Sequence, residues 1–404
     1  MREKEQVSER RNVNGSGTAR EVFGVFFKLG LTSFGGPIAH LGYFRQEVII
    51  KREWISEPAY AELVALCQFL PGPTSSQVGF ALGLNRAGHL GALAAWAAFT
   101  LPSAALMLFL ALLSGSVDGP VAQAVFHGLK LVALVIVAQA VWGMAQAFTP
   151  DLRRAAIAAF AAVILFIAGA TFGQVGAIAF GAGAGLFFCG QHAITHADVL
   201  PIRVPRLSGT ICLLTFGLLL IGLPILTAAT GSPRLELFGI FYRAGALVFG
   251  GGHVVLPLLR VDLVPGLISD ARFLAAYGAA QALPGPLFAI SAFFGAVADN
   301  FAIGAMIALV GIFLPGLLIL SGMLPFWGAI HRNRRVRAAI VGVNAAVVGI
   351  LALALYDPLW TSAVGSWVDV ALAGVALFAL IRWKQAPLNI VAGLVATSIA
   401  LTFV

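Results

Sequence analysis

The sequence has 404 residues, of which 60% are hydrophobic and only 10% charged, and its formal net charge is +8. Soluble domains carry about 25% charged residues, so this composition excludes a soluble protein. Apolar runs of roughly 18–27 residues recur along the chain and match the ~20 residues with which a helix crosses a bilayer. Lipid offers the backbone no hydrogen-bond partners, and the short alternating segments of a β-barrel are absent. We therefore predict an all-α polytopic membrane protein.

The expected membrane elements follow one another in two groups of six with one span between them. Residues 1–20 are polar, lack the apolar core of a cleaved signal peptide and are assigned to a cytoplasmic N-terminal segment. A polar stretch, 191–207, follows the sixth element. The predicted elements cover residues 21–41, 58–84, 88–113, 121–147, 154–170, 173–190, 208–230, 236–258, 271–297, 300–323, 337–356, 361–381 and 387–404.

Three motifs occur twice, in the same order and at nearly constant spacing. Phe34-Gly35-Gly36 returns as Phe249-Gly250-Gly251, at an offset of 249 − 34 = 215 in the numbering. Gln68-Phe69-Leu70-Pro71-Gly72-Pro73 returns as Gln281-Ala282-Leu283-Pro284-Gly285-Pro286, and Leu101-Pro102 returns as Leu314-Pro315, both at an offset of 213. This agreement predicts two homologous repeats, 21–190 and 236–404, joined by the linker 191–235 with one connecting span.

The positions of Lys and Arg indicate how the two repeats are oriented. Six elements plus one linking span is an odd number, so the second repeat is inverted if every element crosses. Cytoplasmic loops carry an excess of Lys and Arg, which predicts a plasma-membrane protein with its N-terminus inside and its C-terminus outside. The basic groups assigned to the inside are Arg10, Arg11 and Arg20, Arg86, Arg153 and Arg154, Arg203 and Arg206, Arg260, 331–335, and Arg382 with Lys384.

Two basic groups resist this orientation. If every element crosses, the loop with Arg45, Lys51 and Arg52 falls outside, and so does Arg234. The elements around Phe34 and Phe249 are interrupted by glycine and could instead be re-entrant.

Proline breaks in both halves point to a binding site. Pro interrupts a helix and is favoured at the start of a new one, so half-helices can begin at Pro73 and Pro286. Their free N–H groups and positive dipole ends attract anions, and such paired interruptions mark the site in transporters with inverted repeats. Thr74, Ser75 and Ser76 add hydroxyl groups in the first half only. The alternative is a structural kink at Pro71-Gly72-Pro73 and Pro284-Gly285-Pro286.

The glycine pairs form a second set of candidates. Gly35 and Gly36, with Gly250 and Gly251, would let the backbone approach a ligand closely, or would let helices pack tightly. Gln68 and Gln281 stand three positions before the two breaks and would either bind an oxyanion or brace the broken helices.

Basic side chains inside predicted spans favour an anionic ligand. Lys28, Lys130 and Arg243 each cost about 2.5–3.5 kcal/mol at a helix centre, which makes a functional role the default hypothesis. The alternative is that they snorkel to an interface. We expect no carboxylate at comparable depth, because Glu62 and Asp369 lie near predicted ends of spans.

Other chemistry is not expected. Cys67, Cys189 and Cys212 show neither a disulfide framework nor metal-ligand spacing. His192 and His196 have metal-ligand spacing but no apparent third ligand, and His40 and His253 flank the glycine motifs as hydrogen-bonded packing residues or titrating groups. We expect no catalytic residue, metal, cofactor or nucleic-acid partner.

The sequence resembles the chromate ion transporter family, in its two-domain form, over nearly the whole chain. The resemblance rests on 34–41, on 68–73 and on their second-half counterparts 249–253 and 281–286. It implies a bacterial plasma-membrane antiporter that exports chromate, confers chromate resistance, meets sulfate as a competitor and is coupled to the proton motive force. A homodimer is a further expectation.

Three alternatives stay open at this point. The first is a carrier that imports sulfate or another oxyanion, and the second is an anion channel. The third, a membrane-embedded enzyme such as a chromate reductase, would need a redox cofactor, and no dinucleotide fingerprint or cysteine cluster is present. We expect alternating access between the two repeats.

Overall fold

The computed structural model describes residues 17–114, 119–189, 200, 202, 204–249, 254–264, 266–328 and 333–403. Every regular element within these residues is a helix, which confirms the all-α prediction. Six helical stretches in the described residues are long and apolar enough to cross a membrane. The total of thirteen membrane elements stays a prediction. These six stretches are Thr74–Leu113, Gln123–Phe148, Leu152–Gly169, Arg206–Thr230, Phe301–Phe326 and Arg334–Ala363.

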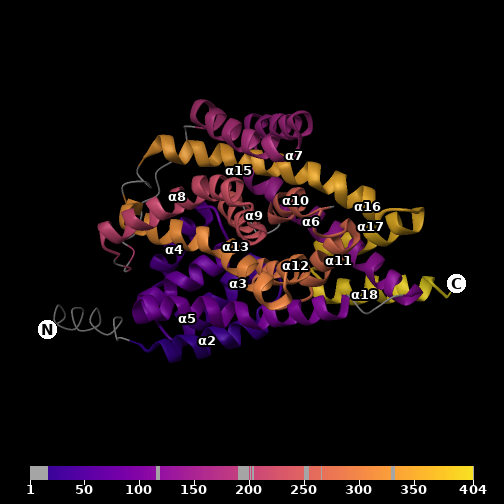
Figure 1. Cartoon of the computed structure of the whole chain (residues 1–404), viewed down its shortest axis with the longest axis horizontal. Coiled ribbons are helices and arrows are strands. Elements are labelled where there is room, and N and C mark those ends of the chain that lie inside the picture. Colours follow the sequence, from indigo (N-terminus) through magenta and orange to yellow (C-terminus); the bar gives the residue numbers. More distant parts are fainter. Residues whose placement is uncertain are drawn as a thin grey trace.

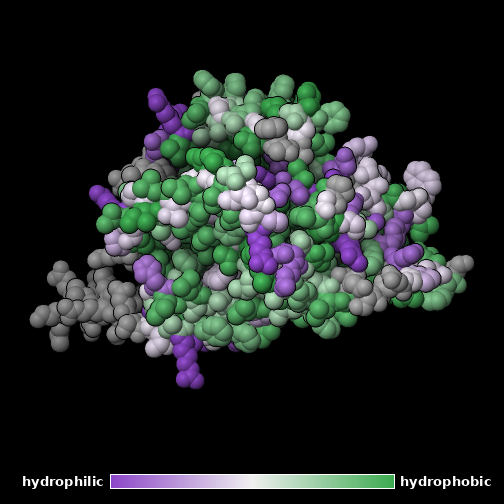
Figure 2. All heavy atoms as spheres, in the orientation of Figure 1, coloured by the Kyte–Doolittle hydropathy of each residue, from purple (hydrophilic) through white to green (hydrophobic). Residues whose placement is uncertain are grey.

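Apolar side chains cover most of the visible surface, and hydrophilic residues form small groups (Figure 2). Phe166 and Ile167 are each 78% exposed, and Leu218 is 72% exposed. Large apolar side chains at such exposure need a lipid environment, because contiguous apolar surfaces of this kind are rare on soluble monomers. The surface therefore agrees with a protein embedded in a bilayer.

The first half contains helices interrupted at glycine or proline. Its elements are α2 (Ala19–Thr32), α3 (Gly36–Phe44), the π-helical η1 (Arg45–Lys51), α4 (Glu57–Phe69), α5 (Thr74–Ser114), α6 (Pro120–Phe148) and α7 (Leu152–Phe188). α5 and α7 are each two helices joined at a sharp turn. In α5 the turn falls at Ala87 and Gly88, where the φ of Gly88 is 63°, and in α7 it falls at Gly169, with a φ of 72°.

The second half repeats this order after the linking helix α8 (Arg206–Thr230). α9 and α10 correspond to α2 and α3, while α11, η3 and α12 correspond to α4 and the first part of α5. α13 corresponds to the second part of α5. The bounds are α9 Pro233–Leu247, α10 Val255–Leu263, α11 Asp270–Ala280, η3 Leu287–Ala289, α12 Ile290–Ala298, α13 Phe301–Met323, η4 Leu324–Phe326, α15 Arg334–Ala354, η5 Leu355–Trp360, α16 Thr361–Ala363, α17 Trp367–Arg382 and α18 Pro387–Leu401.

Equivalent glycines make equivalent close contacts in the two halves. A Cβ at Gly30 in α2 would lie 2.8 Å from the Phe99 carbonyl oxygen in α5, and a Cβ at Gly245 in α9 would overlap the Ile312 carbonyl oxygen in α13. Gly245 is related to Gly30 by the offset of the glycine motifs, and Ile312 is related to Phe99 by the offset of the proline breaks. The repeat in the sequence is thus a repeat in helix packing, which confirms the prediction of two homologous halves.

The two halves exchange their last helices. α7 of the first half packs on α15 of the second, and α17 and α18 of the second pack on α6 of the first. Figure 1 shows α7 on the outer side of α15. At the first contact a Cβ on Gly342 would overlap the backbone of Gly181 and Gly185, and at the second a Cβ on Gly128 would meet Ser398 at 3.1 Å. Small residues allow this close approach, and the exchange interlocks the repeats.

The segment from α2 to η1 is a hairpin whose two ends lie together. The Arg86 side chain pairs with Glu21 at 3.2 Å and lies 5.3 Å from the ring centre of Trp54, which follows η1. The start of α2, the loop after η1 and the turn of α5 therefore meet at one end of the molecule. The loop with Arg45, Lys51 and Arg52 lies at the same end as the start of α2. One of the two basic groups that disagreed with the predicted orientation therefore lies at the same end as the N-terminal helix, as that orientation requires.

Candidate functional site

The two proline breaks meet the start of the other half's glycine motif. The Gly72 backbone N–H donates to the carbonyl of Val248 at 2.7 Å, and the Gly285 N–H donates to the carbonyl of Ser33 at 2.9 Å. Val248 directly precedes Phe249, and Ser33 directly precedes Phe34. The breaks and the glycine motifs, predicted separately, therefore form one reciprocal junction between the halves.

Both break glycines adopt a backbone conformation that disfavours side chains. The φ angles are 122° at Gly72 and 90° at Gly285, which only glycine adopts readily. A Cβ would lie 2.9 Å from Cα of Gly316 in the first case and 2.9 Å from Oγ of Ser103 in the second. Gly316 and Ser103 are themselves equivalent, because the offset of the two breaks also relates them. Each break therefore rests against the other half, at α13 or at the second part of α5.

Polar side chains at the start of α5 brace the first break. Gln77 donates from Nε2 to the carbonyls of Pro71 and Gly316, both at 2.9 Å. Ser75 lies with its Oγ 3.3 Å from Nδ1 of the buried His40. Ser75 thus contacts α3, and Gln77 fixes the broken backbone to α13.

The second break has apolar surroundings instead. Ile290 stands at the position equivalent to Gln77, at the same offset as the breaks themselves. Phe288 is buried, and its ring centre lies 5.8 Å from that of Phe313. The two breaks share a backbone geometry, but only the first is held by a side-chain amide.

Unpaired buried polar atoms gather around the junction. Among the described residues, eight such atoms belong to the breaks or to the segments against them. Buried polar groups are normally hydrogen-bonded, and leaving them unpaired is costly. The eight are Ser33 Oγ, His40 Nε2, Ser76 Oγ, Gln77 Oε1, Trp96 Nε1, Thr100 Oγ1, Gln281 Nε2 and Ser291 Oγ.

The chemistry of these atoms favours an anion. The Trp96 indole and the Gln281 amide nitrogen can only donate, and the hydroxyl groups can donate. Gln77 Oε1 is the one atom among the eight that can only accept. A ligand rich in negatively charged oxygens would match such a set. Sequence reasoning did not single out Trp96 and Thr100, and their spacing of four positions in an apolar helix is the weak signal that could have pointed to them.

The predicted glycine site is only partly described. Gly35 and Gly36 have φ angles of 96° and 79°, and a Cβ on Gly36 would meet nothing within 4 Å. These two glycines therefore turn the chain between α2 and α3 and do not pack a helix. Gly250 and Gly251 lie outside the described residues, as do His192, His196 and His253.

The predicted basic residues have separate surroundings. Lys28 is exposed and attracts Glu47 electrostatically. Lys130 makes no hydrogen bond or ion pair within the part of the chain that the structure describes. Arg243 donates from Nη2 to Oδ2 of Asp262 at 2.7 Å. No observation joins these three side chains into one cationic site.

A carboxylate that the sequence placed in a loop lies beside one of the predicted basic residues. Asp262 lies beyond the span predicted at 236–258, but the chain reverses after Val248 and α10 folds back beside α9, bringing Asp262 to the middle of that helix. Glu47 is its equivalent in the first half, and its side chain is 7% exposed, with Lys51 and Arg52 bonded to it. Lys28 and Arg243 are related by the same offset as Glu47 and Asp262, and this opposite-charge repeat was the signal available in the sequence.

Two further ion pairs are repeated. Arg45 pairs with Glu57 at 2.6 Å, and Arg260 pairs with Asp270 at 2.8 Å. The other is repeated with exchanged charges and a shift of two positions on α9: Glu21 pairs with Arg86, whereas Arg234 pairs with Asp299 at 3.0 Å. These pairs fix the outer ends of the short helices in both halves.

The predicted glutamines do not behave alike. Gln68 is exposed at the end of α4, while Gln281 keeps a buried Nε2 without a hydrogen-bond partner among the described residues. Gln77 has the bracing role that was one of the two expectations for Gln68.

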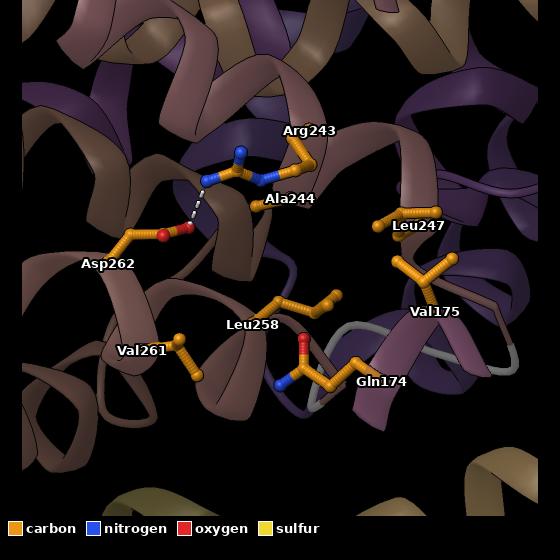
Figure 3. A pocket seen from close by; sticks show the side chains of 8 residues that line it. All are labelled: Gln174, Val175, Arg243, Ala244, Leu247, Leu258, Val261 and Asp262. Carbon is orange, nitrogen blue, oxygen red and sulfur yellow. Dashed lines mark hydrogen bonds and ion pairs between the residues drawn. The ribbon is translucent and has the colours of Figure 1, made fainter. Parts of the chain in front are cut away.

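A pocket beside this junction lies between the halves. It is lined by Gln174 and Val175 from α7 and by residues of α9 and α10, and Arg243 points across it to Asp262 (Figure 3). Gln174 donates from Nε2 to the carbonyl of Pro257 at 3.1 Å. The remaining lining residues are Ala244, Leu247, Leu258 and Val261.

Two repeats that meet at paired helix breaks inside an apolar helical bundle define a polytopic transporter of the repeat-built class. The chain belongs to the chromate transporter family, whose model matches residues 20–186 and 235–399. It is 28% identical to a chromate transport protein of Pseudomonas aeruginosa, over 94% of this chain and 91% of that protein. It is 29% identical to a probable chromate transport protein of Synechococcus elongatus, over 82% of each. A chromate transport protein of Cupriavidus metallidurans is 27% identical over 91% of this chain and 89% of its own length. No solved structure matches the chain.

Proposed function

We propose that this protein exports chromate across the bacterial plasma membrane and thereby confers chromate resistance. The observation that carries the proposal is the donor-rich set of unpaired buried atoms at the junction, where two half-helices begin. The relatives named as chromate transport proteins support the same substrate.

A tetrahedral dianion suits this environment. Helix N-termini attract anions through their free N–H groups and dipole, and hydrogen bonds to a charged acceptor are stronger than neutral ones. The first half-helix supplies Thr74, Ser75 and Ser76, with His40 beside them. The second supplies Ser291 of α12, a helix that packs on α5, which contributes Trp96 and Thr100. Sulfate has the same shape and charge and is the expected competitor.

The same contacts support an inverted arrangement of the repeats. Trp327, just after α13, hydrogen-bonds Glu62 of α4, so the C-terminal end of α13 lies beside α4. The second part of α5, which corresponds to α13, begins at this same end of the molecule, beside Glu21. α8 starts there too, because Gly209 packs against Pro325. α8 is about 37 Å long at 1.5 Å per residue and carries the chain to the opposite end. The N-terminus is then cytoplasmic and the C-terminus outside, and Figure 1 draws α2 beginning and α18 ending at opposite ends of the long axis.

Transport would proceed by alternating access, with the repeats rocking about the junction and the proton motive force as the energy source. The paired backbone hydrogen bonds of Gly72 and Gly285 supply a symmetric pivot at the centre. The ligand would sit between the halves and would satisfy donors from both.

The test is uptake of radiolabelled chromate into inverted membrane vesicles from cells that express this protein, with vesicles from cells lacking it as the reference. Saturable accumulation that sulfate inhibits and a protonophore abolishes is the expected result. Accumulation in whole cells that sulfate suppresses would indicate an importer, and flux that does not saturate would indicate a channel. Either result would overturn the proposal of active export.

A further inference from the structure

The Arg243–Asp262 pair has an unusual position for an ion pair. Arg243 is the eleventh residue of α9, roughly 15 Å along the helix. Its side chain is 40% exposed and that of Asp262 is 21% exposed, and both line a pocket whose other walls are mostly apolar. Charged residues among the apolar helices of a membrane protein are expensive and usually functional. The pair is therefore open to a small ligand and is not sealed into the core.

An oxyanion entering this pocket would compete with Asp262 for Arg243. The guanidinium donates to Asp262 at 2.7 Å, and the carboxylate occupies the place that a ligand oxygen would take. Gln174 cannot replace Arg243 as a counterion because it is uncharged, and its Nε2 is engaged by the Pro257 carbonyl. A proton on Asp262 removes the competing negative charge and leaves Arg243 free to bind an anion.

Few charged groups surround Asp262. α10 packs on α7, α9 and α15. From α9 the facing charge is Arg243. α7 contributes Gln174, and its basic residues, Arg153 and Arg154, stand in its first turn. The described basic residues of α15 also lie in its first turn: Arg334, Arg335 and Arg337. Arg260, on α10 itself, is bonded to Asp270.

We infer that Asp262 binds a proton when Arg243 binds the transported oxyanion, so that a proton and an anion move through the pocket together. This inference rests on the proposed function, because it assigns the coupling of that transport. A dianion that leaves with one proton carries one net negative charge outward, and the inside-negative membrane potential drives such a movement. Co-movement differs from the exchange expected of an antiporter.

The equivalent residues of the first half, Lys28 and Glu47, show why only the second half would couple a proton to the anion. Glu47 is held by both Lys51 and Arg52, while Lys28 acts on it only through electrostatic attraction. Its carboxylate is thus neutralised without Lys28. Asp262 depends on Arg243 as its facing cation among the described residues, so its protonation and the freedom of Arg243 are linked.

The experiment uses the full chain in liposomes that contain a pH-sensitive dye, with chromate added outside at mildly alkaline pH, where the substrate carries no proton itself. We expect chromate entry to acidify the lumen, and the half-saturation concentration to rise by about 5–150-fold as pH increases, the usual range of coupling between two ligands. In Asp262→Asn, chromate entry should continue without lumenal acidification, and the half-saturation concentration should not change with pH. Asp270→Asn removes a matched ion pair at the helix ends and should behave as the wild type.

Two results would overturn the inference while leaving chromate transport intact. One is an Asp262→Asn protein that still moves protons with chromate, and the other is a wild-type protein whose lumen becomes alkaline as chromate enters. Should Asp262→Asn fail to fold, proton uptake on chromate binding to the detergent-solubilised wild type decides the matter: uptake supports the inference, and its absence refutes it. A wild-type protein that moves no chromate would instead refute the proposed function.

Discussion

The backbone N–H of Gly72 donates to the carbonyl of Val248, and the equivalent N–H of Gly285 donates to the carbonyl of Ser33. Each half of the protein thus satisfies a backbone group at the interrupted helix of the other. Unsatisfied backbone groups are costly in a bilayer, so the two interruptions stabilise one another. Each break supplies the hydrogen-bond donor that the other half's backbone needs, and the two breaks together hold the halves in contact.

Replacing Gly72 by alanine should damage this joint. The φ of 122° at Gly72 is strained for a residue with a side chain, at about 1–3 kcal/mol, and the new Cβ would press on the rigid Gly316 backbone. We expect Gly72→Ala to lower the midpoint of thermal unfolding in detergent and to abolish chromate transport. Gly217→Ala in α8 is the control, because nothing lies within 4 Å of that position. Equal unfolding midpoints for the two variants would contradict the account.

The two breaks should respond differently to loss of the side chain at their equivalent positions. Gln77→Leu removes both hydrogen bonds from Nε2 and leaves the buried Pro71 carbonyl without another partner among the described residues, at about 1–3 kcal/mol for an unsatisfied group. Ile290→Leu conserves volume at the equivalent position and should cost less than about 1.5 kcal/mol. Denaturant or thermal unfolding of both variants measures the difference. If Gln77→Leu is no less stable than Ile290→Leu, Gln77 does not brace the break.

Removing an unpaired donor should weaken binding without weakening the fold. Trp96→Phe keeps a ring against Phe313, whose centre lies 5.7 Å away, but deletes an indole N–H that has no protein partner among the described residues. A hydrogen bond to a charged group contributes about 1.5–3 kcal/mol, so the half-saturation concentration for chromate should rise about tenfold or more, with an unchanged unfolding midpoint. Trp327→Phe, which loses a hydrogen bond to Glu62, should show the opposite pattern. A Trp96→Phe protein that is destabilised but binds chromate normally would place the indole in the fold and not in the site.

Membrane sidedness can be tested with single cysteines. After replacement of the native Cys67, Cys189 and Cys212, a cysteine at Glu53 should react with an impermeant maleimide from the cytoplasmic side, because the loop after η1 lies beside Arg86 and the start of α2. A cysteine at Arg234 should react from the outside, and one at its partner Asp299 should agree with it. Reaction of Glu53→Cys and Arg234→Cys from the same side would rule out the inverted arrangement.

The features that could be predicted from the sequence are those that neighbouring residues determine by themselves. A Pro-Gly-Pro run interrupts a helix more surely than the single prolines that α5, α8 and α13 accommodate, so the breaks at Gly72 and Gly285 and the repeat that relates them could be predicted. Apolar runs marked the long helices for the same reason. The turn inside α5 at Gly88 also falls where two predicted elements were separated.

The site was less predictable because its contacts join distant segments. Nothing local to Val248 or Ser33 indicates that their carbonyls accept hydrogen bonds from the other half. Asp262 was placed in a loop because hydropathy cannot show that α10 folds back beside α9. Trp96 and Thr100 look like ordinary residues of an apolar helix, and only their packing against the second half reveals that their donors are unpaired. Gln68, by contrast, had the right spacing but is exposed.

The terminal helices are exchanged between the halves: α7 packs on α15, and α17 and α18 pack on α6. This exchange bears on whether the two halves could be encoded as separate chains. A polypeptide that ended after the first repeat would present the Gly181 and Gly185 surface to lipid in place of Gly342. Two separately encoded halves would have to be synthesised in equal amounts. Fusion into one chain fixes that stoichiometry at one to one and lets the halves diverge, as Gln77 and Ile290 have, without either losing its mate.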